Sequence, residues 1–169
     1  TLEVWFQLAD VNQRGGGVMG IQGPGDFFDT IVLGERRSQH WISGSNHFVR
    51  TDDFPESTAE TTVGQTLHLA MVYAADGTTA LYRNGVPYGS EYQAGGVVTF
   101  EAEKSQIVFG LRHGPPGGNK LLNGLIDRAR LYDRALRPDE VAASAGVAST
   151  YVSEEELVAQ LSESERQQR

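Results

Sequence analysis

The sequence predicts an all-β fold: a two-sheet antiparallel β-sandwich of the jelly-roll type that carries a short helical tail at its C-terminus. Twenty glycines, many of them in turn-like clusters, interrupt the 169 residues every few positions. Short apolar segments with the alternation of half-buried strands fill the intervals, and no long helical period occurs before the tail. Many short strands joined by regular turns are typical of sandwiches and jelly rolls.

The opening segment, residues 1–10, has the clearest strand pattern. The side chains on one face are all large and apolar, namely Leu2, Val4, Phe6 and Leu8. The other face carries Glu3, Trp5 and Gln7. This period of two predicts a strand with one buried face and one solvated face.

A central meander is predicted where apolar segments alternate with tight-turn dipeptides. Residues 67–74 and 78–83 have strand character, and the dipeptides Asp76-Gly77 and Asn84-Gly85 follow them. Both dipeptides favour hairpin turns because their residues tolerate positive φ. The remaining predicted strands cover residues 18–22, 27–33, 97–100, 106–111 and 125–132.

Two helical segments follow the last strand. Pro138 can open a helix because its fixed φ suits the first helical position, and Gly146 can close it. In the tail, Ser153 and Glu156 have the spacing of a capping box. We therefore expect a sandwich domain over residues 1–149 and a helical linker over residues 150–169 that leads into the rest of a larger parent protein.

The closing segment, residues 123–141, has a distinctive order of residues: Gly124, Ile126, Asp127, Tyr132, Arg134, Ala135, Leu136, Glu140 and Val141. With residues 68–89 and 1–6, it resembles the LamG-like domains of the concanavalin A-like lectin and glucanase superfamily. The resemblance covers residues 1–145 and implies two packed antiparallel sheets that bind glycans or proteins. It also implies a secreted or bacterial cell-envelope protein, because such domains usually belong to multidomain extracellular proteins.

Composition excludes two classes of partner. The formal net charge of −8 opposes a surface built to neutralise phosphates, so we expect no nucleic acid to bind. The longest apolar run, residues 67–75, is interrupted by His68 and is far shorter than the roughly 20 residues of a membrane-spanning helix. We therefore expect no membrane insertion. The lack of cysteine fits both a reducing compartment and an exported domain.

Neither the glycine-rich motifs nor the histidines indicate a cofactor. Gly15, Gly17 and Gly20 match a dinucleotide fingerprint, but no crossover helix follows them, so we expect a flexible turn. The four histidines show neither H-x-H nor H-x-x-x-H spacing, and without cysteine a zinc site is not expected.

Glycosidases also occur in the superfamily, and they need two carboxylates on opposite sides of the scissile bond. Glu101 and Glu103 would share one face of a strand, yet no further acid completes a glucanase E-x-D-x-x-E pattern. We therefore expect no catalysis from this chain.

Strand alternation places Asp127 on the same face as Leu125, Ala129 and Leu131, which we expect in the core. A buried carboxylate needs a partner. Backbone amides or Arg134 could supply one. A calcium ion is the alternative, although the sequence does not identify the other oxygen ligands that calcium requires. No other cofactor is expected.

The segment 35–50 concentrates side chains suited to a sugar, because sugars stack on aromatic rings and bridge polar groups. The candidate ligand-binding residues within it are Trp41, His47, Asn46, Arg36 and Arg50. The alternative is that Trp41 belongs to a strand core and that the arginines solvate a sheet edge.

We therefore expect a non-catalytic recognition or adhesion module that binds a carbohydrate or a neighbouring protein, including other domains of the parent chain. A structural spacer without a ligand of its own is the first alternative. A diverged glycoside hydrolase is the second.

Overall fold

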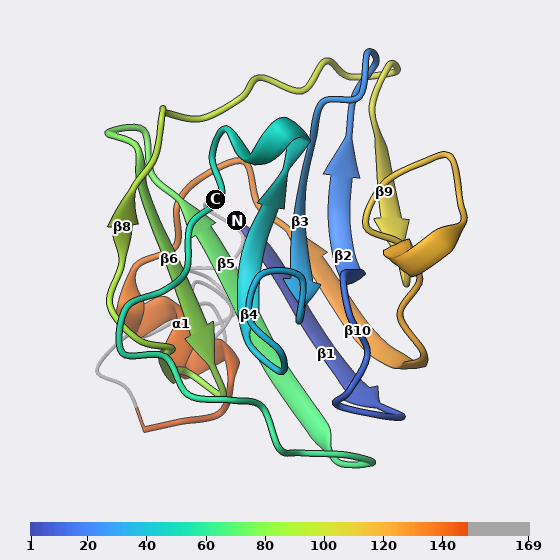
Figure 1. Cartoon of the computed structure of the whole chain (residues 1–169). Coiled ribbons are helices and arrows are strands. Elements are labelled where there is room, and N and C mark those ends of the chain that lie inside the picture. The colour runs from blue at the N-terminus through green and yellow to red at the C-terminus, as the bar shows by residue number, and fades with distance from the viewer. Residues whose placement is uncertain (149–169) are drawn as a thin grey trace, which may run out of the picture.

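The computed structural model describes residues 1–148, which form two antiparallel sheets packed face to face, as predicted (Figure 1). The six-stranded sheet has the order β10-β1-β5-β6-β7, with β8 also paired to β6. Its strands are β1 (Leu2–Leu8), β5 (Thr66–Tyr73), β6 (Thr78–Arg83), β7 (Val86–Pro87), β8 (Tyr92–Gln93) and β10 (Gly124–Leu131). The four-stranded sheet has the order β4-β3-β2-β9. Its strands are β2 (Gly16–Gln22), β3 (Phe28–Leu33), β4 (Trp41–Ser45) and β9 (Gln106–Phe109).

The core lies between the sheets and begins with the alternate apolar residues of β1. Leu2, Val4, Phe6 and Leu8 are each at most 2% exposed. Phe6 meets the ring of Trp41 from the opposite sheet edge-on, with ring centroids 5.5 Å apart. Burial of each such side chain contributes about 1.5–3 kcal/mol, so these contacts hold the two sheets together.

Most predicted strands lie within two residues of their expected bounds, and two segments differ. Residues 97–100 form no strand, and Val97 is 54% exposed because the segment lies outside both sheets. Conversely, Trp41–Ser45 forms β4, which pairs with β3 from Leu33↔Trp41 to Asp29↔Ser45.

Gly17 and Gly20 lie in β2 and Gly15 lies in the bend before it, so the three glycines do not form the flexible turn expected from the sequence. A Cβ on Gly17 would lie 2.5 Å from Cα of Arg112, and one on Gly20 would lie 2.1 Å from Oγ1 of Thr30. The loop that contains Arg112 crosses this face, where Thr30 Oγ1 donates a hydrogen bond to the Arg112 carbonyl at 2.6 Å. The glycines therefore allow the loop to lie directly on the strand.

One helix, α1 (Pro138–Ser144), covers part of the outer face of the six-stranded sheet. It begins at Pro138 as predicted. Its buried residues are Glu140 and Val141. Val141 packs with Leu136 against Ala70, Val72 and Tyr82. The predicted helical linker over residues 150–169 lies outside the described residues. Within residues 1–148, no helix is long and apolar enough to cross a membrane.

Asp127 is exposed, which corrects the prediction of a buried carboxylate. β10 is the outermost strand of its sheet, and its pairing with β1 contains a bulge: Trp5 pairs with Arg128, but Phe6 pairs with Ile126. Asp127 is the extra residue in that bulge, so the period of two on which the prediction relied is broken there. Among residues 1–148, the buried carboxylates are instead Glu3, Asp29, Glu60 and Glu140.

Candidate functional site

One end of the sandwich exposes two aromatic rings and an imidazole. The short helix η1 (Asn46–Phe48) follows β4 directly, with His47 exposed and Phe48 51% exposed. Phe27, the residue before β3, is 46% exposed. The Nη2 atom of Arg50 donates hydrogen bonds to the carbonyl of Phe28 at 3.1 Å and to Oδ1 of Asn46 at 3.3 Å. This contact holds the two segments side by side. Phe27, Asn46, His47 and Phe48 are termed the end surface below.

The backbone of the end surface is strained. His47 has φ 49° and Phe48 has φ 57°, in the left-handed region that bulky residues rarely adopt. Such conformations cost roughly 1–3 kcal/mol each and persist only where the surroundings hold them. Because both side chains point to solvent, burial of their own surface does not offset this cost.

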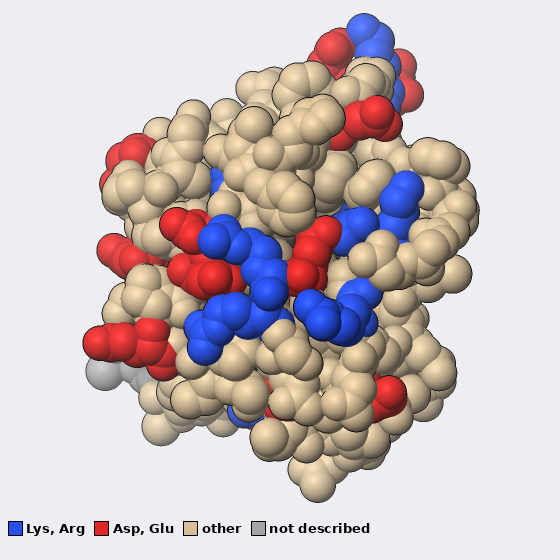
Figure 2. All heavy atoms as spheres, in the orientation of Figure 1, with Lys and Arg blue, Asp and Glu red and all other residues tan. Residues whose placement is uncertain are grey.

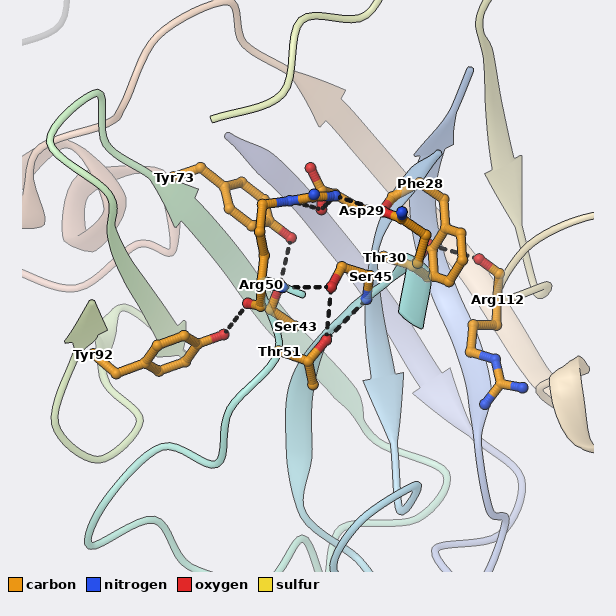
Figure 3. Close-up of polar contacts among 11 residues, drawn as sticks. Phe28, Asp29, Thr30, Ser43, Ser45, Arg50, Thr51, Tyr73, Tyr92 and Arg112 are labelled. Carbon is orange, nitrogen blue, oxygen red and sulfur yellow. Dashed lines mark hydrogen bonds and ion pairs between the residues drawn. The ribbon is translucent and has the colours of Figure 1, made fainter. Parts of the chain in front are cut away.

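A buried ion pair anchors this strained segment (Figure 3). Arg50 donates to Oδ1 of Asp29 from Nη2 at 2.8 Å and from Nε at 3.1 Å. Both side chains are 6% exposed. The pair lies at the end of the sandwich interior because Asp29 shares a strand face with Ile31, a core residue.

Hydroxyl groups complete the anchor. The backbone N–H of Arg50 donates to Ser45 Oγ at 2.9 Å, and the backbone N–H of Ser45 donates to Thr51 Oγ1 at 3.0 Å. From the opposite sheet, the Tyr92 hydroxyl donates to the Arg50 carbonyl at 3.0 Å (Figure 3). The bonds among Ser45, Arg50 and Thr51 close residues 45–51 into a loop beside β4 of the four-stranded sheet. The Tyr92 bond ties the same loop to the six-stranded sheet.

Burial dominates the electrostatics of the anchor. It raises the pKa of Asp29 to about 6, although the charge and hydrogen bonds of Arg50 act in the opposite direction. Burial also raises the pKa of Tyr73 well above its ordinary value, and the nearby Asp29 adds to that rise. Asp29 and Arg50 therefore support the end surface from inside and do not themselves face a ligand.

The structure divides the five residues predicted to bind a ligand. Trp41 is fully buried, and its Nε1 donates to Oε2 of Glu60 at 3.1 Å, so it belongs to the core. Arg50 is buried in the anchor. Arg36 lies in a different loop, where it pairs with Asp52 at 3.0 Å. The structure brings together Asn46, His47 and Arg50, and only the first two belong to the end surface.

Sequence reasoning missed the two exposed rings, Phe27 and Phe48. The aromatic role was assigned to Trp41, which lies among the polar and charged residues of the segment 35–50. A signal was present in the spacing, since His47 and Phe48 directly follow the polar pair Ser45-Asn46 and continue no strand alternation. Phe27 likewise follows the turn residues 23–26.

A calcium site at Asp127 does not fit the structure. Its side chain is exposed in the β10 bulge, next to Arg128, whose positive charge opposes a cation. Of residues 1–148, no three or more His, Cys, Asp or Glu side chains cluster in a way that could hold a metal ion. Asp127 alone does not supply the six to eight oxygen ligands that calcium takes.

The outer face of the four-stranded sheet carries charges of both signs. Figure 2 shows Lys and Arg side chains near the middle of this face and Asp and Glu side chains beside them. Ion pairs of the bordering loops include Arg36 with Asp52 and Arg112 with Glu35. Paired charges of this kind neutralise one another and favour no single sign of ligand.

Comparison with known proteins gives one family and several solved structures. The family described as the concanavalin A-like lectin/glucanases superfamily matches residues 1–142. No curated protein matches the chain.

Three solved structures share the fold. The first is domain 4 of an extracellular arabinanase from Geobacillus stearothermophilus in complex with arabinotriose, with 23% identity, TM-score 0.63, and coverage of 85% of this chain and 65% of that one. A pentraxin from Limulus polyphemus has 18% identity, TM-score 0.58, and coverage of 85% and 69%. A candidate carbohydrate binding protein from Bacteroides ovatus has 16% identity, TM-score 0.63, and coverage of 83% and 39%. The chain thus spans just under two thirds of the arabinanase domain.

Proposed function

We propose that this chain, which belongs to the concanavalin A-like lectin/glucanases superfamily, is a non-catalytic module that binds a carbohydrate at the end surface. A fold of this kind hosts both lectins and hydrolases, so the proposal depends on the site and not on the fold alone.

The observation that carries the proposal is the strained, exposed pair His47 and Phe48. Strained backbone tends to persist at binding sites, where it presents side chains that a relaxed loop would not. Here the buried ion pair of Asp29 and Arg50 holds the loop in that conformation.

The chemistry of the end surface suits a sugar. The rings of Phe27 and Phe48 supply apolar faces on which a pyranose or furanose can stack. The His47 imidazole and the Asn46 amide can exchange hydrogen bonds with sugar hydroxyls. Binding to arabinotriose by the arabinanase domain of similar fold supports a glycan as the ligand class.

The proposal assigns no hydrolysis to the chain. Glu101 and Glu103, the acids weighed for catalysis, lie in or beside a turn, and Glu101 pairs with Lys104 at 2.7 Å. A retaining glycosidase needs two carboxyl groups about 5 Å apart across the scissile bond. The exposed, lysine-paired position of Glu101 favours a solvated surface role.

The proposal places the module outside the cell, in a secreted or bacterial envelope protein, beside other domains of a parent chain. Support comes from the arabinanase of similar fold, which is extracellular and contributes a single domain to the comparison. Neighbouring domains would then be its protein partners.

A glycan array that includes arabino-oligosaccharides tests the proposal. Phe48→Ala and Phe27→Ala should each weaken binding to the glycan found by at least tenfold while circular dichroism stays native. The matched control is Phe109→Ala, because Phe109 is 48% exposed but lies in β9. The site assignment would be overturned if the Phe27→Ala and Phe48→Ala variants bound the glycan as tightly as the native protein. It would also be overturned if Phe109→Ala alone lost glycan binding.

Two further results would overturn the function itself. Absence of binding to any glycan would favour a structural spacer. Shortened products released from the bound glycan and detected by mass spectrometry would show that the module is a hydrolase.

A further inference from the structure

Part of the outer face of the six-stranded sheet lies beside the area that α1 covers. Val141 of α1 packs on Ala70, Val72 and Tyr82. The next row across the same face consists of Arg128, Trp5 and His68, which are direct pairing partners on β10, β1 and β5. These side chains point outward, because the neighbours of Trp5 in β1 lie in the core and successive side chains of a strand alternate between faces. This set of three is termed the outer row below.

The outer row is apolar in its middle and positive at one end. The guanidinium carbon of Arg128 lies 5.2 Å from the ring centroid of Trp5, and the His68 ring lies 4.7 Å from the Trp5 ring on the other side. Trp5 is half-buried and Arg128 is exposed. An indole in this position offers a large apolar contact area. The row therefore suits a segment that carries apolar side chains followed by an acidic one.

His68 adds a polar requirement to the row. Its side chain is 4% exposed, and its Nε2 donates to Oε1 of Glu3 at 2.9 Å, since a carboxylate can only accept. The buried Nδ1 has no hydrogen-bond partner among residues 1–148. Buried polar atoms are nearly always paired in folded proteins, so a further polar group belongs beside His68.

The described part of the chain ends next to the outer row. A Cβ on Gly85 would lie 2.8 Å from Cγ2 of Val147, so the residues after α1 cross the turn between β6 and β7. In the same turn, the Asn84 side chain accepts a hydrogen bond from the backbone N–H of His68 at 2.9 Å. The residues that follow therefore start close to the His68 end of the row.

We propose that the tail, residues 150–169, packs on the outer row as an amphipathic helix and covers Trp5. From β6 across β5 and β1 to β10 is three strand spacings, or about 14 Å. A helix from Ser153 to Glu165 is about 18 Å long. The tail therefore has the length to cross from the β6 turn to β10.

The order of side chains in the tail matches the order of the row. With the period of a helix, one side of the tail carries Glu154, Leu157, Val158, Leu161 and Glu165. Glu154 comes first and accepts a hydrogen bond from Nδ1 of a protonated His68. The apolar residues in the middle cover the Trp5 ring, and Glu165 reaches Arg128 at the far end.

The other arginine near Trp5 has no part in the proposal. Arg130 already donates to Ser144 of α1 at 3.1 Å and lies 3.9 Å from Glu3. The acidic residue at the end of the tail is therefore assigned to Arg128. The inference is also independent of the proposed glycan site, which lies on β3 and the segment after β4.

Iodide quenching of tryptophan fluorescence in the whole chain tests the proposal. The sequence has two tryptophans, and Trp41 is fully buried, so a quencher that stays in water reports on Trp5. Leu157→Ser combined with Leu161→Ser should raise the quenching constant at least twofold, because Trp5 loses its cover. Adding Trp5→Phe to that variant should abolish the increase. The matched control is Ala159→Ser, which lies on the opposite side of the helix and should change nothing.

A charge reversal tests the contact at the end of the row. Arg128→Glu should expose Trp5 to iodide, because it places two like charges together. Combining it with Glu165→Arg should restore most of the protection, since opposite charges then face one another again. Glu163→Arg is the matched control: Glu163 lies on the opposite side of the helix, so this substitution should not restore protection.

Four outcomes would overturn the proposal. The first is equal quenching in the native protein and the double leucine variant. The second is an equal increase in quenching with Ala159→Ser. The third is a dimer in light scattering whose dissociation on dilution exposes Trp5, which would mean that a second copy covers the row. The fourth is protection of Trp5 that develops only when a glycan is added, which would make the row a ligand site.

Discussion

Arg50 donates two hydrogen bonds to a single oxygen of Asp29, Oδ1, across 21 residues of sequence and within the buried end of the sandwich. The same guanidinium also reaches the Phe28 carbonyl and the Asn46 side chain. Sequence reasoning assigned Arg50 to a ligand, whereas the structure makes it the anchor of the loop that presents His47 and Phe48. We derive predictions from this arrangement, from the buried Glu60 and from the exposed Asp127.

Arg50→Ala should destabilise the fold by about 3–5 kcal/mol, because it leaves the Asp29 carboxylate buried without its partner. Urea denaturation measures the loss. Replacing both members, with Asp29→Leu and Arg50→Met together, should restore much of it, since no buried charge then remains. An Arg50→Ala protein of unchanged stability that binds glycan less well would instead mean that Arg50 contacts the ligand directly.

Phe48→Gly should raise the free energy of unfolding by about 0.5–1 kcal/mol, because glycine adopts a left-handed φ without the steric cost that phenylalanine bears. It should also abolish stacking and weaken glycan binding. Phe48→Ala separates the two effects, since alanine removes the ring but keeps the strain. A loss of stability in the glycine variant would show that the Phe48 ring packs on the protein.

Stability should depend on pH through Glu60, a fully buried carboxylate that accepts hydrogen bonds from Arg83 Nε at 2.8 Å and Trp41 Nε1 at 3.1 Å. Burial alone would raise its pKa, but hydrogen bonds from Arg83, Thr62 and Trp41 lower the pKa to about 2. In the unfolded chain a glutamate has a pKa of about 4.3. The unfolded state therefore binds the proton first as the pH falls.

The stabilisation from Glu60 is thus present above about pH 4.5 and is lost as the pH falls toward 2. Glu60→Gln should lower the free energy of unfolding by about 3 kcal/mol at pH 7. The difference in the free energy of unfolding between the native protein and the variant should become smaller as the pH falls. Urea midpoints measured between pH 3 and 7 test this. A gap that stays constant over that range would show that the carboxylate charge contributes nothing.

Asp127→Ala should change the free energy of unfolding by no more than about 0.5 kcal/mol, because the side chain is exposed in the β10 bulge. Adding calcium to chelator-treated protein should leave the Tm unchanged, since Asp127 lies beside Arg128 and not among other oxygen ligands. A Tm that rises with calcium concentration would show that the protein binds the ion at another place.

Local patterns were sufficient to predict the strands that form the centre of the fold. The alternation in residues 1–10 predicted β1, and the dipeptides Asp76-Gly77 and Asn84-Gly85 predicted the turns around β6. Pro138 predicted the start of α1. Each of these signals acts within a few residues, because it depends on side-chain periodicity or on the φ that a residue can adopt. They determined the all-β class and the faces of the central strands.

The tertiary structure alone decided which residues can meet a ligand. A bulge between β1 and β10 turned Asp127 out of the interior, and no local pattern in β10 marks it. Trp41 lies in the core because its ring packs on Phe6 and its Nε1 donates a hydrogen bond to Glu60, both from other segments of the chain. Phe48 remains exposed. Pairing partners far apart in sequence set these outcomes, since burial depends on what packs across the two sheets and not on the residue type itself.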